Sequence, residues 1–120
     1  MHNYEIAEYF SLLAKLMDIH GENAFKIKSY SNASYTLDRL NDPLEAMTPV
    51  QIAGIRGIGD ALAQKIVDLL ATKKLQILEE YIEKTPPGIL EMLKIKGLGP
   101  KKIITIWKEL GIESIGELLY

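Results

Sequence analysis

Two short glycine-containing segments carry the residues of this 120-residue chain whose types and spacing are best suited to chemistry. They read Ile55-Arg56-Gly57-Ile58-Gly59 and Ile95-Lys96-Gly97-Leu98-Gly99, and they lie forty residues apart. Glycine permits positive φ and close approach of another molecule, and the amides that open a following helix attract anions. Because each segment also places one cation before its glycines, the pair predicts phosphate binding by the backbone rather than catalysis.

The repeat extends upstream of the glycines, to Thr48-Pro49 and Thr85-Pro86. Each Thr is suited to cap a helix and each Pro to occupy its first turn. The repeated unit is therefore predicted to be a capped short helix, a glycine hairpin and a second helix. The alternative is that the glycines simply end helices, which is common, but the duplication favours two grips on one phosphate backbone. The residues predicted to bind are Arg56, Gly57, Gly59, Lys96, Gly97, Gly99, Lys101 and Lys102.

The net charge of −2 argues mildly against a nucleic-acid partner, because such domains are usually basic. Charge is unevenly distributed, however: the segment 94–108 holds five lysines and no acid. We therefore expect the second hairpin to be the stronger grip. A solvated helix face is the alternative interpretation of these lysines.

The composition excludes several other classes. The chain has no cysteine, so disulfides and thiolate metal sites are excluded, and His2 and His20 lack partners at metal-ligand spacing. No apolar run approaches membrane-spanning length, and the N-terminus lacks the features of a secretion signal. A hydrophobic content of 48% is enough for a core. We expect a cytoplasmic protein with no membrane partner.

The apolar period is helical almost throughout, which predicts an all-α fold. A first stripe comprises Ile6, Phe10, Leu13 and Met17, on a helix from Asn3 to before Gly21. A second helix, capped by Asn23, is expected to carry the stripe Phe25, Tyr30, Ala33, Leu37 and Leu40. Further helices are expected after Thr48, around 62–70, and at 75–82, 89–93, 100–110 and 115–120, with Trp107 packed in the core. Thr85-Pro86-Pro87-Gly88 is the strongest helix breaker, so the predicted domains are 1–84, with the first hairpin unit at about 48–71, and 85–120.

Several segments of the sequence, taken in their order along the chain, resemble those of a known family. They are Gly21-Glu22-Asn23-Ala24-Phe25-Lys26-Ile27-Lys28-Ser29-Tyr30, Arg56-Gly57-Ile58-Gly59, Ala71-Thr72-Lys73-Lys74-Leu75 and 94–102. Together they resemble the N-terminal lyase-type, 8 kDa-like domain and the start of the next subdomain of family X DNA polymerases, the family of DNA polymerase beta. The resemblance is closest to bacterial members that carry a polymerase and histidinol phosphatase (PHP) domain.

The resemblance implies a helical domain with two helix-hairpin-helix motifs that binds gapped or 5′-phosphorylated DNA without sequence specificity, in DNA repair. It also implies a monomer in the bacterial cytoplasm, associated with the nucleoid. The family's Schiff-base nucleophile, which removes a 5′-deoxyribose phosphate, falls on Lys65, its assisting tyrosine on Tyr30 and its 5′-phosphate ligand on Lys26. No cofactor is expected except a monovalent cation, K⁺ or Na⁺, at the hairpins; Mg²⁺ belongs to the polymerase domain. The family's cation-binding carbonyls fall on Ala53, Ile55, Ile58, Leu93, Ile95 and Leu98.

Other interpretations remain open at this stage. Two pocket lysines of the family are replaced by Ala61 and Ile77, and Asp68 could pair with Lys65, so Lys65 is alternatively a DNA-contacting or surface lysine. A base-excision glycosylase acting through Lys101 would need a later aspartate, and none follows Gly99. A protein-interaction repeat is the alternative without DNA. No aspartate triad for nucleotidyl transfer is present, so we expect an N-terminal fragment of a longer enzyme, and whether this part is itself an enzyme stays open.

Overall fold

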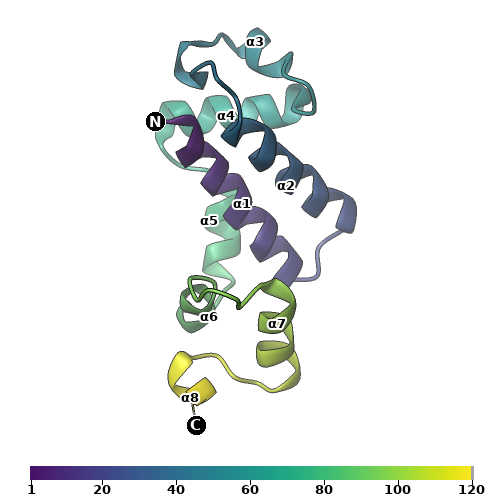
Figure 1. The fold of residues 1–120 in the computed structure, drawn as a ribbon, viewed down its shortest axis with the longest axis vertical. Coiled ribbons are helices and arrows are strands. Elements are labelled where there is room, and N and C mark those ends of the chain that lie inside the picture. Colours follow the sequence, from purple (N-terminus) through teal and green to yellow (C-terminus); the bar gives the residue numbers. More distant parts are fainter. Residues whose placement is uncertain (120) are drawn as a thin grey trace.

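The computed structural model describes residues 1–119, and in this range all regular structure is helical, as predicted (Figure 1). The elements are α1 (Asn3–Ile19), α2 (Ala24–Asp38), the 3₁₀ turn η1 (Leu44–Ala46), α3 (Pro49–Ala53), α4 (Gly59–Thr72), α5 (Gln76–Glu83), α6 (Pro87–Met92), α7 (Pro100–Ile104), the π-helical turn η2 (Thr105–Glu109) and α8 (Ile115–Leu119). The molecule is elongated, with extents of 51 × 25 × 23 Å. No helix among the described residues is long and apolar enough to cross a membrane.

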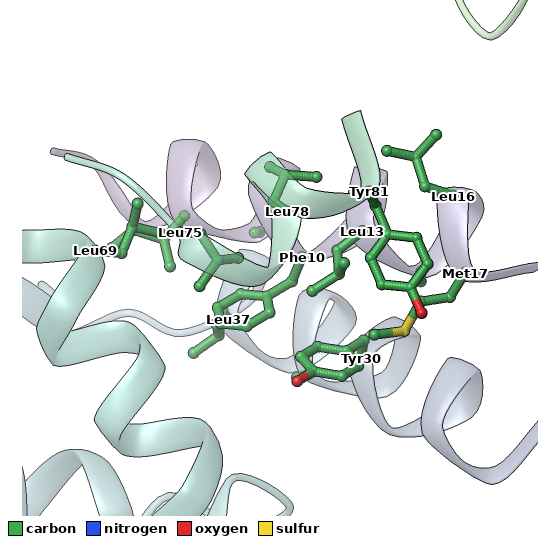
Figure 2. Close-up of a cluster of buried hydrophobic side chains, with 14 of the residues drawn as sticks. Phe10, Leu13, Leu16, Met17, Tyr30, Leu37, Leu69, Leu75, Leu78 and Tyr81 are labelled. Carbon is green, nitrogen blue, oxygen red and sulfur yellow. The ribbon is translucent and has the colours of Figure 1, made fainter. Parts of the chain in front are cut away.

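Helix α1 is the centre of the fold, because α2, α5 and α7 all pack against it. The predicted stripe Ile6, Phe10, Leu13 and Met17 is completely buried. The Phe10 ring stacks on Tyr30 of α2, with ring centroids 5.8 Å apart, and Figure 2 shows Leu78 and Tyr81 of α5 in the same cluster. Burying one such side chain contributes roughly 1.5–3 kcal/mol, so this stripe orders the elements around it.

Helix α2 begins as predicted but buries only part of its expected stripe. The Asn23 side chain accepts the N–H of Phe25 at 2.7 Å, and Tyr30, Ala33 and Leu37 are buried. Phe25 was expected on the same stripe, and that prediction is wrong: its side chain is 80% exposed. Five residues before Tyr30 is about 140° round the helix from the core face, at about 100° per residue.

The two threonine caps behave differently. The Thr48 hydroxyl accepts the N–H of Gln51 at 3.2 Å, and the Gln51 side chain accepts the N–H of Thr48 at 2.8 Å, so this capping box confirms the prediction. Thr85 does not cap α6, because Pro86 occupies the cap position. The Thr85 hydroxyl instead donates to the Tyr81 carbonyl at 2.6 Å, one turn back in α5.

The predicted helix 100–110 is helical over most of its length but changes its winding. It follows α-helical geometry to Ile104 and then widens into η2, where the N–H of Leu110 donates to the Thr105 carbonyl, five residues back, at 3.2 Å. Such π-helical turns are rare. The half-buried Trp107 lies in this turn, with its indole N–H 3.0 Å from a carboxylate oxygen of Glu113.

The predicted segments 1–84 and 85–120 meet at the end of α1, where His20 is the C-cap residue. The His20 ring lies edge-on to the Tyr81 ring at 5.6 Å and to the Trp107 ring at 5.5 Å. Its Nε2 lies 2.8 Å from the hydroxyl of Thr85. The Tyr81 hydroxyl in turn donates to Glu22 at 2.7 Å; burial and this carboxylate raise the pKa of Tyr81 to about 12.

The surroundings of His20 favour its neutral form. Burial of the ring, together with the positive charges of Lys108 and Lys84, lowers the pKa of His20 below its ordinary value of 6.5. The unfolded chain therefore takes up the His20 proton more readily than the folded protein.

The free energy of unfolding is accordingly expected to fall as the pH drops below about 6.5, and to stop falling for this reason below the folded pKa. Urea unfolding between pH 8 and 5 measures this, with His20→Gln as the control that removes the titrating group. Equal pH profiles for the two proteins in that window would contradict the assignment. Carboxylates such as Glu22, whose pKa is lowered by its hydrogen bond from Tyr81, act in a separate, more acidic window.

Candidate nucleic-acid interface

The two glycine hairpins have the same backbone hydrogen bonds, displaced by forty residues. In the first hairpin, the N–H of Ile55 donates to Ile52 at 3.1 Å, and that of Ile58 donates to Ile55 at 3.0 Å. In the second, the N–H of Ile95 donates to Met92 at 3.0 Å, and that of Leu98 donates to Ile95 at 3.1 Å. The sequence repeat is therefore also a repeat of backbone structure.

Apolar side chains at corresponding positions anchor both hairpins. Ile52 and Met92 are buried before the turns, and Ala63 and Ile103 are buried after them. All four glycines of the two turns are exposed. In each hairpin, the side chains on either side of the turn are thus buried in the core, while the glycines of the turn are exposed to solvent.

The first glycine of each turn requires left-handed backbone, and the second does so only in one copy. Gly57 has φ +88° and Gly97 has φ +86°. Gly59 has φ +68° and begins α4, whereas Gly99 has φ −83° and is the N-cap of α7. The sequence did not reveal this difference, because it depends on whether the helix begins one residue earlier or later.

The free amides at the turns belong to the glycines themselves. Within the described residues, the N–H groups of Gly57, Gly59, Gly97 and Gly99 make no backbone hydrogen bond. The amides of Ile58 and Leu98, which directly follow the first glycines, donate within the turns to the Ile55 and Ile95 carbonyls. The N–H groups of four exposed glycines in two matching turns can donate hydrogen bonds to the oxygens of an anionic ligand such as phosphate.

Positive charge gathers at the second hairpin. Lys94, Lys96, Lys101 and Lys102 are all exposed there, and Lys102 Nζ donates to the Gly97 carbonyl at 3.1 Å. At the first hairpin, the exposed Arg56 has the exposed acid Asp60 only four residues away. The placement of the lysines agrees with a stronger electrostatic grip at the second hairpin, and Lys102 additionally braces its turn, which the sequence did not reveal.

The carbonyls predicted to hold a monovalent cation are partly occupied. Those of Ile55 and Ile95 each accept the N–H three residues on, which leaves one lone pair on each oxygen. For His and acidic side chains, the described residues contain no group of three or more that could hold a metal ion. The backbone cation sites remain a prediction.

Lys65 lies half-buried on α4 and lines a surface pocket of about 590 Å³ between α4 and α5. The pocket is lined by Lys65, Asp68, Thr72, Lys74, Leu75, Gln76, Ile77 and Glu80. Asp68, considered above as an ion-pair partner of Lys65, instead accepts the side-chain amide of Gln64 at 2.9 Å, and no salt bridge joins it to Lys65 in the described part of the chain.

The other two residues of the implied lyase site lie outside this pocket. Tyr30 is buried in the core against Phe10, and this burial raises the pKa of its hydroxyl. Lys26 is exposed in the first turn of α2. Ile77, where the family has a lysine, lines the pocket, while Ala61 is exposed and does not. The structure therefore gathers Lys65 with Lys74 rather than with Lys26 and Tyr30.

Comparison with known proteins agrees with this geometry. Residues 1–75 match a helix-hairpin-helix domain. The chain belongs to the helix-hairpin-helix family. This match contains the first hairpin, and the second hairpin lies beyond it, where the repeated hydrogen bonds show the same turn.

A full-length relative extends the comparison. The chain is 30% identical over 118 residues to the N-terminal part of the DNA polymerase/3′-5′ exonuclease PolX of Bacillus subtilis (strain 168). The alignment covers 98% of this helix-hairpin-helix chain and 20% of the relative, so the chain spans about a fifth of that protein's length. The resemblance to the N-terminal region of family X polymerases is thereby confirmed.

The two glycines of the second hairpin provide a matched pair for testing the turn. Gly97→Ala forces an L residue to φ +86° and is expected to cost about 1–2 kcal/mol. Gly99→Ala meets no atom within 4 Å and needs no positive φ, but it replaces the glycine N-cap of α7, so it is expected to cost only about 0.5 kcal/mol. Urea unfolding of the two variants measures the difference. Equal losses would show that the left-handed turn is not what Gly97 provides.

Proposed function

We propose that this chain is a DNA-binding module that grips the phosphate backbone of DNA, without sequence specificity, through two helix-hairpin-helix motifs. The observation that carries the proposal is the repeated turn, with four exposed glycines whose N–H groups make no backbone hydrogen bond. Backbone N–H groups and lysines read phosphate and not bases, so the binding is independent of sequence.

Charge placement reconciles this function with a net charge of −2. Many acids lie away from the hairpins, for example the exposed Glu79 and Glu80 of α5, whereas the segment 94–108 at the second hairpin holds five lysines and no acid. Each phosphate that these lysines neutralise releases a counterion, which makes affinity depend on salt.

The partner in this proposal is gapped or 5′-phosphorylated DNA, with Lys26 as the phosphate ligand, bound by a monomer in the bacterial cytoplasm during repair. Its support is the similarity to the N-terminal part of PolX, whose name describes a polymerase and an exonuclease. In such an enzyme this module would hold the DNA while other parts perform nucleotidyl transfer. K⁺ or Na⁺ at the hairpin carbonyls would add positive charge at the same contacts.

Charge reversal at the second hairpin tests the grip. Lys101→Glu is expected to lower affinity for a DNA duplex by about an order of magnitude, and to reduce the slope of log affinity against log salt by about one. Fluorescence anisotropy with two unrelated duplexes, over a range of salt, measures both effects. Arg39→Glu, outside both hairpins, makes the same charge change as a control. Equal losses in the two variants would contradict a localised grip.

A second candidate function is 5′-deoxyribose-phosphate lyase. The position of Lys65 favours this function, because the side chain is half-buried and lines a pocket. Asp68, the carboxylate that could have paired with Lys65, instead accepts a hydrogen bond from Gln64. Its neutral amine would attack C1′ of the open sugar, and loss of water would give an imine. Removal of a C2′ proton then expels the 3′ phosphate by β-elimination, and water hydrolyses the imine to restore the lysine.

Borohydride trapping distinguishes this second function, because the reagent reduces the imine to a stable amine. With an abasic 5′ end, we expect a covalent adduct of the unaltered protein and of Lys74→Ala, which alters the same pocket. Lys65→Ala is expected to give no adduct. Absence of an adduct from the unaltered protein, or its persistence in Lys65→Ala, would rule out Lys65 as the nucleophile.

A further inference from the structure

At the end of α1, one side chain contacts residues from both predicted segments, beside the direct packing of α7 on α1. His20 touches Tyr81 of α5, Thr85 in the connection to α6, and Trp107 of η2. Helix α1 packs on α2 and α5 and belongs to the same core as Ile58 and Ile66 of the first hairpin unit. Trp107 follows α7, the second helix of the second hairpin unit. His20 therefore provides a contact between the two units in addition to the packing of α7 on α1.

The hydrogen bonds at this junction have a fixed direction. The Thr85 hydroxyl has one hydrogen and donates it to the Tyr81 carbonyl at 2.6 Å. It can only accept from His20, so the Nε2 of His20 carries the hydrogen. Hydrogen bonds also hold the two aromatic rings that flank His20: the Tyr81 hydroxyl donates to Glu22, and the Trp107 indole N–H donates to Glu113. An edge-on ring between two anchored aromatic rings has little freedom to move.

We propose that His20 is a positioning residue that fixes the second hairpin relative to the first, so that both grip one DNA molecule at a set spacing. This inference rests on the proposed DNA-binding function. Two grips joined in one molecule strengthen each other only when their separation matches that of their targets. The effect of His20 is therefore on DNA long enough to span both hairpins, and not on DNA held by one.

The charged groups around His20 make this positioning sensitive to acid. Lys84 at the end of α5 and Lys108 of η2 oppose a positive charge on the ring, whereas Glu22 and Glu113 are each already engaged by a neighbouring aromatic residue. The Lys108 ammonium lies 3.6 Å from the Trp107 ring centre, and the Lys84 ammonium lies 5.0 Å from that of Tyr81. Protonated His20 would thus face two lysines.

The first experiment measures the spacing directly and needs no DNA. The chain has no cysteine, so spin labels can be placed at Val50→Cys and Glu91→Cys, both at exposed positions, one in each hairpin unit. Double electron–electron resonance measures the distance between the two spin labels, and it is expected to give one narrow distance distribution for the otherwise unaltered protein. A broader distance distribution is expected for His20→Ala. The same is expected for Thr85→Val, which replaces the hydroxyl that contacts His20 and Tyr81 with a methyl group. His20→Gln retains a donor for Thr85 and should stay narrower than His20→Ala. Unchanged distributions in both His20→Ala and Thr85→Val would overturn the proposal.

The second experiment compares a short duplex with a longer one that spans both hairpins, using the unlabelled protein. His20→Ala is expected to lose about tenfold or more in affinity for the long duplex, and to keep its affinity for the short one. As the pH falls from 8 to 5, the advantage of the long duplex should shrink more in the unaltered protein than in His20→Gln. Equal loss on both duplexes would indicate a merely structural role and overturn the proposal, as would no loss on either.

The two experiments separate failure of this inference from failure of the proposed function. If the unaltered protein binds neither duplex, the DNA-binding function itself fails, and this inference fails with it. If it binds the long duplex more tightly, and Lys101→Glu weakens this while His20→Ala does not, only the role of His20 is wrong. Thr85→Val keeps the test decisive if His20→Ala does not fold.

Discussion

The burial of one face of α1 is the constraint on which the rest of the structure depends. Helices α2, α5 and α7 all pack on this helix, and its stripe of Ile6, Phe10, Leu13 and Met17 is completely excluded from solvent. Three of the four hairpin helices, α3, α6 and α7, have only five or six residues, so they depend on packing against the rest of the molecule. The turns are therefore rigid because of what lies beneath them. The geometry of the turns is thus tied to the core that is shared with α1.

The two hairpins have the same backbone structure but different surroundings. The matching turn hydrogen bonds and the left-handed first glycines make them equivalent in shape. Their surroundings differ: lysines surround the second turn, and the first lies on the element that carries Lys65. In the proposed function the second hairpin mainly holds the strand. The first supplies fewer charges and brings the strand near the pocket of Lys65.

Much of the fold was predictable from the sequence, because it follows from local rules. The 3.6-residue period located the helices, Asn23 and Thr48 marked two helix starts, and the repeat located both turns. These features depend on residues within a few positions of each other.

What could not be predicted depends either on contacts between distant segments or on a choice between several possible local geometries. Thr85 was expected to cap α6, but it bonds back to α5 and meets His20, 65 residues away. The pairing of Asp68 with Gln64 rather than Lys65, the brace from Lys102 to Gly97 and the π-helical turn at Trp107 are choices among locally equivalent geometries. Lys65 was identified only through family resemblance. The pocket that Lys65 lines is formed jointly by residues of α4, the following turn and α5.

The claim that both turns bind one DNA backbone through glycine amides is tested most directly by NMR. The ¹⁵N-labelled chain would be titrated with duplexes of two unrelated sequences, and the amide signals of Gly57, Gly59, Gly97 and Gly99 followed. The account predicts that all four signals shift along one common binding curve, and that the curve is the same for both sequences. Shifts confined to one hairpin, or absent from all four glycines while other residues respond, would contradict it.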